Sequence, residues 1–166
     1  MNFMKTILPV LFSLVSIFSL AQSPKIEGNK LKLDKAVSFK TGSTELTDEG
    51  KEALAQVRDF LVAKDYITTL RVEGHTANDG VEGANQILSE KRALAICLWL
   101  MDNKIDCKRL IAVGFGSTKP VADNSTPAGK AENRRIEFVM AGMRGKAIGA
   151  MPLDGGGKLA GDLCAD

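Results

Sequence analysis

The sequence predicts an α/β (α+β) sandwich, in which a mixed sheet with the order β-α-β-α-β-β carries its helices packed on one face. Two observations lead to this prediction. Short segments in which apolar and polar residues alternate predict strands, and two longer segments with apolar residues at helical spacing lie between them. Because strands and helices alternate along the chain, we expect right-handed β-α-β crossovers and some parallel pairing of strands.

The first half of the compact region predicts a strand, a helix and a second strand. Residues 31–39 alternate, which is typical of one strand or a short hairpin, and the Thr-Gly-Ser sequence at 41–43 interrupts them. Thr47 or Asp48 is suited to cap the helix that follows. Its apolar stripe consists of Leu54, Val57, Phe60 and Leu61. Residues 67–73 alternate again and predict a strand.

The second half predicts a helix and two more strands. Glycines at 74, 80 and 83 mark a loop, after which a helix is predicted over about residues 84–103. Its stripe consists of Leu88, Ala95, Ile96, Trp99 and Leu100. Residues 110–113 form a short apolar strand that ends at Gly114. A loop containing Pro120 and Pro127 follows, and residues 135–140 alternate as the last strand.

Four regions are expected along the chain. Lys5, the apolar run 7–20 and the small residues Ser19 and Ala21 have the layout of a signal peptide over residues 1–21. The alternative is an N-terminal membrane anchor, which is disfavoured because a membrane span needs about 20 apolar residues. Residues 22–29 are a polar entry segment, and residues 30–141 are the compact domain. Residues 142–166 form a Gly-rich tail without helical or strand period, which we predict to be flexible.

Composition excludes several classes of function. The net charge of +2 is too small to indicate a nucleic-acid partner, and no later segment is apolar enough to cross a membrane. The three cysteines form no Cys-x-x-Cys pair and the single histidine lies near none of them, so a zinc site is disfavoured. Cys97 is expected to fill the core. In an oxidising compartment Cys107 and Cys164 are the pair to test first for a disulfide.

The segment from Val72 to Arg92 carries a resemblance to a known family. It reads V-E-G-H-T-A-N-D-G, then Asn85, then L-S-E-K-R-A. This resembles the OmpA-like C-terminal domain, the peptidoglycan-associated module of bacterial envelopes, whose pattern is V-E-G-H-T-D, a Gly, an Asn and L-S-x-x-R-A. Residues 37–46 resemble the family's first strand and turn, and residues 114–137 resemble its G-x-G…P…N-R-R-[VI]-E ending. The likeness spans residues 31–139.

The resemblance implies an α/β sandwich that binds the peptide stems of peptidoglycan without covalent chemistry. In the family, the Asp of G-H-T-D pairs with the side-chain ammonium of meso-diaminopimelate, and the Arg of L-S-x-x-R-A pairs with its carboxylate, which suits a planar guanidinium. Arg92 matches the Arg, but Ala77 stands at the position of the Asp. Loss of one partner of a buried charge pair costs about 2–5 kcal/mol of binding, so weakened binding is expected.

Three alternatives remain open at Ala77. Asp79 is a candidate substitute anion, although Asp before Gly is also a common turn residue. The ligand is otherwise held by its carboxylate alone, or the chain is an OmpA-like scaffold or interaction domain that has lost peptidoglycan binding. Each of these alternatives leaves the fold prediction unchanged.

Further residues match positions that line the family's pocket, and each has an alternative structural role. Thr76 and Asn85 are such residues, and Asn85 is alternatively a helix cap. Leu88 packs under the ligand stem or fills the core. Phe39, at the end of the first strand, forms a wall of the pocket or fills the core. Arg134 and Arg135 begin the last strand, where successive side chains point to opposite faces, so only one of them easily faces the site.

The predicted function is therefore binding without catalysis. His75 lies in no His-x-x-His or His-x-Glu spacing, which disfavours a metal site or a hydrolase, and no cofactor is expected. We expect an exported protein of the periplasm, associated with the cell wall or the inner face of the outer membrane. Peptidoglycan is the predicted partner, and other envelope proteins are further candidate partners.

Overall fold

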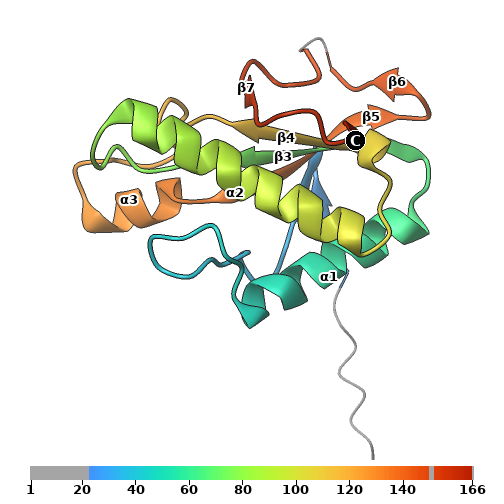
Figure 1. Cartoon of the computed structure of the whole chain (residues 1–166), viewed down its shortest axis with the longest axis horizontal. Coiled ribbons are helices and arrows are strands. Elements are labelled where there is room, and N and C mark those ends of the chain that lie inside the picture. Colours follow the sequence, from blue (N-terminus) through green and yellow to red (C-terminus); the bar gives the residue numbers. More distant parts are fainter. Residues whose placement is uncertain (1–22, 150–151, 166) are drawn as a thin grey trace, which may run out of the picture.

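The computed structural model describes residues 23–149 and 152–165 (Figure 1). The predicted signal peptide over residues 1–21 lies outside them. The elements in order are β1 (Lys25–Glu27), β2 (Lys30–Lys32), α1 (Asp48–Ala63), β3 (Ile67–Gly74), α2 (Glu82–Asp102), the 3-10 turn η1 (Cys107–Arg109), β4 (Leu110–Gly114), α3 (Pro127–Asn133), β5 (Ile136–Met143), β6 (Lys146–Ala147) and β7 (Lys158–Leu159). In this part of the chain no helix is both long and apolar enough to cross a membrane.

The strands form one mixed sheet in the order β1-β2-β5-β3-β4-β7, and β6 pairs with β5. Strand β3 is parallel to β4, to which α2 connects it, and antiparallel to β5. Helices α1 and α2 lie on one side of this sheet, and the C-terminal segment lies on the other (Figure 1). The predicted mixed sheet with helices on one face is confirmed.

The main core lies between the sheet and the two long helices. Leu70 and Val72 of β3 point into it and are fully buried. From the helices, Leu54, Leu61, Ile96 and Leu100 meet them. Burial of each such side chain stabilises the fold by about 1.5–3 kcal/mol. The predicted cap of α1 is confirmed at Thr47, whose hydroxyl accepts a hydrogen bond of 3.0 Å from the Gly50 nitrogen.

Two segments before residue 142 differ from the prediction, and the predicted tail, which contains β6 and β7, is a third. Strand β1 lies inside the predicted polar entry segment and forms a hairpin with β2, whereas Phe39 makes only an isolated bridge with Leu46. Helix α3 occupies the predicted proline loop. Thr126 caps it by accepting from the Gly129 nitrogen, and Pro127 fits the first turn because its missing N–H would have no partner there. Helix α3 has no large apolar side chain, so its sequence shows no apolar period.

The C-terminal residues 152–165, which we call the strap, cover the side of the sheet opposite the helices and add β7 to its edge beside β4 (Figure 1). The Arg71 guanidinium donates to the Leu153 carbonyl at 2.8 Å, and the Lys119 ammonium donates to the Gly155 carbonyl at 3.1 Å. A Cβ atom added at Gly157 would lie 2.3 Å from Cγ1 of Val113. The strap is thus held by backbone carbonyls and by glycines that allow close approach. Alternating apolar residues do not hold it, which is why the sequence predicted a tail without strands.

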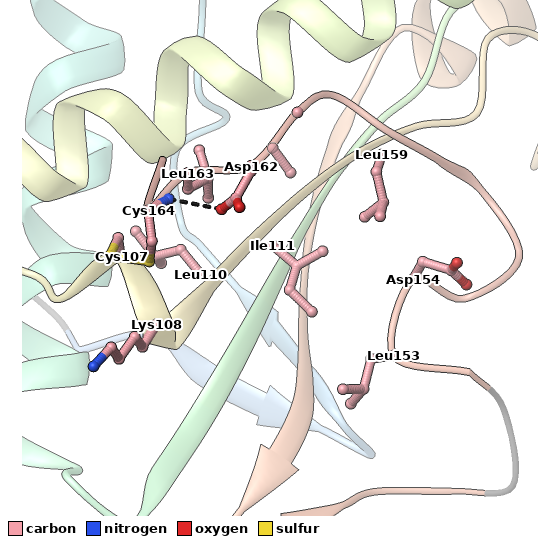
Figure 2. Close-up of a pocket in the computed structure, with 12 residues that line it drawn as sticks. Cys107, Lys108, Leu110, Ile111, Leu153, Asp154, Leu159, Asp162, Leu163 and Cys164 are labelled. Carbon is pink, nitrogen blue, oxygen red and sulfur yellow. Dashed lines mark hydrogen bonds between the residues drawn. A yellow bond between two sulfur atoms is a disulfide. The ribbon is translucent and has the colours of Figure 1, made fainter. Parts of the chain in front are cut away.

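A disulfide ties the end of the strap to the domain. Cys107 beside β4 is bonded to Cys164, with a Cα–Cα distance of 5.4 Å, and Cys97 is buried and free. Both expectations for the cysteines are confirmed. Between the strap and β4 lies an apolar pocket of about 700 Å³ (Figure 2). Its apolar lining includes Leu110, Ile111, Leu153, Leu159 and Leu163.

Candidate functional site

Two glycines bring the ends of β3 and β4 into contact with α2. A Cβ atom added at Gly74 would lie 2.2 Å from the Ser89 carbonyl oxygen, and one at Gly114 would lie 2.6 Å from the Glu90 nitrogen. A residue with a side chain would therefore force these elements apart. The Ser89 hydroxyl also accepts a hydrogen bond of 2.9 Å from the Gly116 nitrogen. These contacts fix the loop after β3 beside the first half of α2.

Hydrogen bonds hold this loop in one conformation. The Thr76 nitrogen donates to the Gly116 carbonyl at 2.9 Å. The buried side-chain amide of Asn85 donates to the Asp79 carbonyl at 2.9 Å. The N-cap of α2 is Val81, which makes no side-chain capping bond, so the expectation that Asn85 caps the helix is wrong. Asn85 instead connects the helix to the loop that would meet a ligand.

Arg92 is the central cation of the site. It lies half-buried on α2, with its guanidinium carbon 5.1 Å from the centre of the Phe39 ring and its Nε donating to the Ser43 carbonyl at 3.3 Å. Among the residues that the structure describes, no carboxylate pairs with it. Burial lowers the pKa of Arg92, and the nearby positive charge of Arg134 lowers it further. A bound anion would relieve both effects.

Asp79 lies in the same loop and is already paired. Its Oδ1 accepts from the Lys130 ammonium at 2.6 Å, and its Oδ2 accepts from the Arg134 guanidinium at 3.2 Å. The hydrogen bond from Lys130 holds the pKa of Asp79 below its usual value. The start of α2, helix α3 and the cyan turn after residue 39 meet at one end of the molecule (Figure 1). Helix α3 thus supplies Lys130, which the sequence did not point to.

The position next to Thr76 offers no charge. Ala77 is 2% exposed and Thr76 is 5% exposed, and no hydrogen-bond partner of the Thr76 hydroxyl was found within the described part of the chain. Leu88 lies one helical turn before Arg92, is half-buried and stands outside the core cluster. Phe39 packs against that core, as one of its two expected roles requires, and its ring also lies against the Arg92 guanidinium.

Arg134 and Arg135 are expected to begin the last strand, but Arg134 is the C-cap of α3 and β5 begins at Ile136. Their side chains nevertheless point to different places. Arg134 turns toward Asp79. Arg135 donates to a Glu137 carboxylate oxygen at 2.7 Å and to the Lys119 carbonyl at 3.3 Å, on the strap side of the sheet. The structure therefore brings Arg134 to the candidate site and leaves Arg135 outside it. One of the two faces the site, as expected, although both precede the strand.

A second polar cluster lies on the strap side. One ligand atom each of Glu73, His75 and Glu137 lies within 4.8 Å of the others. Although burial alone would raise the pKa of Glu137, hydrogen bonds and charges from Lys30 and Arg135 lower it to about 2. The two carboxylates are already bound by cations, namely Arg71, Arg135 and Lys30. This arrangement favours an internal salt-bridge network over a site for a divalent cation.

Comparison with known proteins agrees with this geometry. The model of the OmpA family matches residues 38–134. The chain belongs to the OmpA family. It is 36% identical over 114 residues to the outer-membrane lipoprotein YfiB of Pseudomonas aeruginosa, covering 69% of this chain and 67% of that relative. It is 36% identical to the peptidoglycan-binding protein ArfA of Mycobacterium bovis, covering 63% of this chain but only 32% of that protein.

Solved structures show the same fold. The peptidoglycan-associated lipoprotein from Burkholderia pseudomallei is 29% identical, with a TM-score of 0.57 over 63% of this chain and 89% of that one. The cell wall anchor of the type VI secretion system from P. aeruginosa is 31% identical, with a TM-score of 0.54 over 60% of this chain and 71% of that one. The predicted OmpA-like fold is confirmed. The family match ends at residue 134, so the strap lies beyond it.

Proposed function

We propose that this protein binds the peptide stems of peptidoglycan non-covalently in the bacterial envelope, with Arg92 as its anchoring cation. The observation that carries the proposal is the half-buried guanidinium of Arg92. It has no carboxylate partner in the described chain and lies where α2 meets the turn at Ser43 in an OmpA-family fold. Its similarity to a peptidoglycan-binding protein and to a peptidoglycan-associated lipoprotein supports the proposal. Relatives named as outer-membrane proteins support an envelope location, and we propose the periplasm.

The geometry gives each residue a role in this proposal. Arg92 would donate two parallel hydrogen bonds to the side-chain carboxylate of a diaminopimelate residue, while Phe39 keeps the guanidinium plane in place. Leu88 would contact the apolar stem, and Thr76 would offer a hydroxyl. Asp79 as substitute anion stays a prediction, since its carboxylate is engaged by two cations.

Sedimentation with purified sacculi tests the proposal. Charge-assisted hydrogen bonds contribute about 1.5–3 kcal/mol, so Arg92→Ala should weaken binding about 10- to 100-fold. Lys91→Ala is the matched control, because Lys91 is the exposed neighbour of Arg92 on the same helix. Its binding should stay within about twofold of wild type. If the wild-type protein does not co-pellet with sacculi, the proposal fails.

A second candidate function is an envelope scaffold or interaction domain that keeps the fold without the ligand. The buried, uncharged Ala77 favours it. Ala77→Asp discriminates the two, with circular dichroism to show that the variant folds. A large gain in sacculus binding would indicate a weakened but intact site, whereas tight binding by the wild type would exclude the scaffold function. For either function we propose no catalysis, which predicts no release of fragments from intact sacculi.

A further inference from the structure

The charges around Arg92 are unbalanced. Arg92, Arg134 and Lys130 contribute three cations, and Asp79 contributes the one carboxylate that pairs with any of them in the described structure. Three positive charges and one negative charge leave an excess of two. Arg134 is close enough to Arg92 that its positive charge lowers the pKa of the Arg92 guanidinium. Such a site attracts anions and repels ammonium groups.

The one acid at the site is poorly placed to hold a ligand ammonium. Each oxygen of the Asp79 carboxylate accepts a hydrogen bond, Oδ1 from Lys130 and Oδ2 from Arg134. A ligand ammonium would have to displace one of these cations or approach both of them. Ala77 offers no alternative, because it is buried and carries no polar atom on its side chain. Thr76 could supply only a neutral hydroxyl.

Arg92, in contrast, has unused binding capacity. A guanidinium carries five N–H donors, and the hydrogen bond found for Arg92 uses Nε alone, toward Ser43. A carboxylate on the remaining donors would offset the burial of the charge and its repulsion by Arg134. Most of the favourable binding free energy should therefore come from the contact between Arg92 and a carboxylate of the ligand.

We infer that this site recognises the carboxylate of its ligand and does not require the side-chain ammonium of a diamino acid. The inference rests on the proposed function and specifies its ligand class as stem peptides that end in a side-chain carboxylate. A stem residue with a carboxylate and no side-chain amine should bind as well as one with both groups. A stem residue with an amine and no free carboxylate should bind poorly.

Four synthetic stem peptides that differ only in their third residue test this by calorimetry on the whole chain. The residues are meso-diaminopimelate, 2-aminopimelate (which lacks the side-chain amine), diaminopimelate with its side-chain carboxyl amidated, and lysine. We expect the first two to bind within about threefold of each other and the last two to bind at least about tenfold more weakly. A loss of about tenfold or more for 2-aminopimelate, or equal binding of lysine, would overturn the inference.

Two variants separate the remaining explanations. Asp79→Asn should leave the ratio of affinities for the first two peptides unchanged, whereas selective loss of diaminopimelate binding would identify Asp79 as the ammonium partner and contradict us. Ala77→Asp should introduce a preference for diaminopimelate over 2-aminopimelate. Binding of sacculi by the wild type with an amine-dependent peptide ranking defeats this inference alone. Absence of binding to sacculi and to all four peptides defeats the proposed function with it.

Discussion

Reduction of the Cys107–Cys164 disulfide should lower the free energy of unfolding. The bond joins residues 57 positions apart, and closing a loop of that length restricts the unfolded chain. The chain-entropy relation gives about 4 kcal/mol at 25 °C, of which measured disulfides commonly deliver about 2–4 kcal/mol. Since small domains are stable by about 5–15 kcal/mol, the loss should be a large fraction of the total.

Urea unfolding followed by circular dichroism, with and without reductant, measures this loss. We expect the midpoint to fall by about 1–2 M, because the slope for a domain of this size is about 2 kcal/mol/M. The double variant Cys107→Ser and Cys164→Ser should unfold at the midpoint of the reduced wild type and should not respond to reductant. Cys97→Ala should keep the full response, since Cys97 is free and buried. Equal midpoints for oxidised and reduced wild type would refute the reasoning.

Two further predictions concern Glu137 and Gly74. Because its pKa is lowered to about 2 in the folded protein, Glu137 contributes stability that is present above the ordinary value near 4.5 and is lost as the pH falls toward 2. In Glu137→Gln, the loss of unfolding free energy between neutral pH and pH 2 should be smaller than in wild type by about 1–2 kcal/mol. The control Glu52→Gln, at an exposed position, should lose as much as wild type. Identical acid-unfolding curves for Glu137→Gln and wild type would exclude this role. Gly74→Ala should destabilise the domain by about 2–4 kcal/mol and weaken sacculus binding, because its Cβ would lie 2.2 Å from the Ser89 carbonyl. Gly83→Ala, in a helix with open space around it, should stabilise by about 0.5–1 kcal/mol, and thermal melts that rank these two glycine variants in the opposite order would contradict us.

The parts of the fold that bury a regular apolar face could be predicted from the sequence. The stripe of α1 and its Thr47 cap, the alternation of β3 and the start of β5 follow from the periods of two and 3.6 residues. Strand β1 could not be found in this way, because it has only three residues and its single apolar residue, Ile26, is exposed. The start of α3 did carry a signal, since Thr126 followed by Pro127 is a common way to begin a helix.

The candidate site was only partly predictable for a similar reason. A local motif pointed to Asp79, Asn85 and Arg92, which lie close together in the sequence. Lys130 reaches Asp79 from 51 residues away, on a helix that has no apolar period. The sequence predicted that only one of Arg134 and Arg135 faces the site, but it placed both in the last strand. In the structure Arg134 is the C-cap of α3, so the end of a helix that the sequence did not predict sets its direction. Contacts between residues that lie far apart in the sequence leave no local pattern, so they could not be predicted.

The strap also covers one edge of the sheet. Without it, β4 would be an outer strand with unpaired backbone groups beside apolar side chains, which is a template for aggregation. Strand β7 pairs with Val113 and Gly114, and the disulfide fastens the segment that carries it. At the opposite edge, β1 is three residues long, has only exposed residues and begins with a lysine, and these features discourage pairing with another strand. One edge of the sheet is thus covered by a segment that a disulfide holds in place, and the other edge ends in a short, charged strand. Two copies of the protein should therefore not pair through their edge strands.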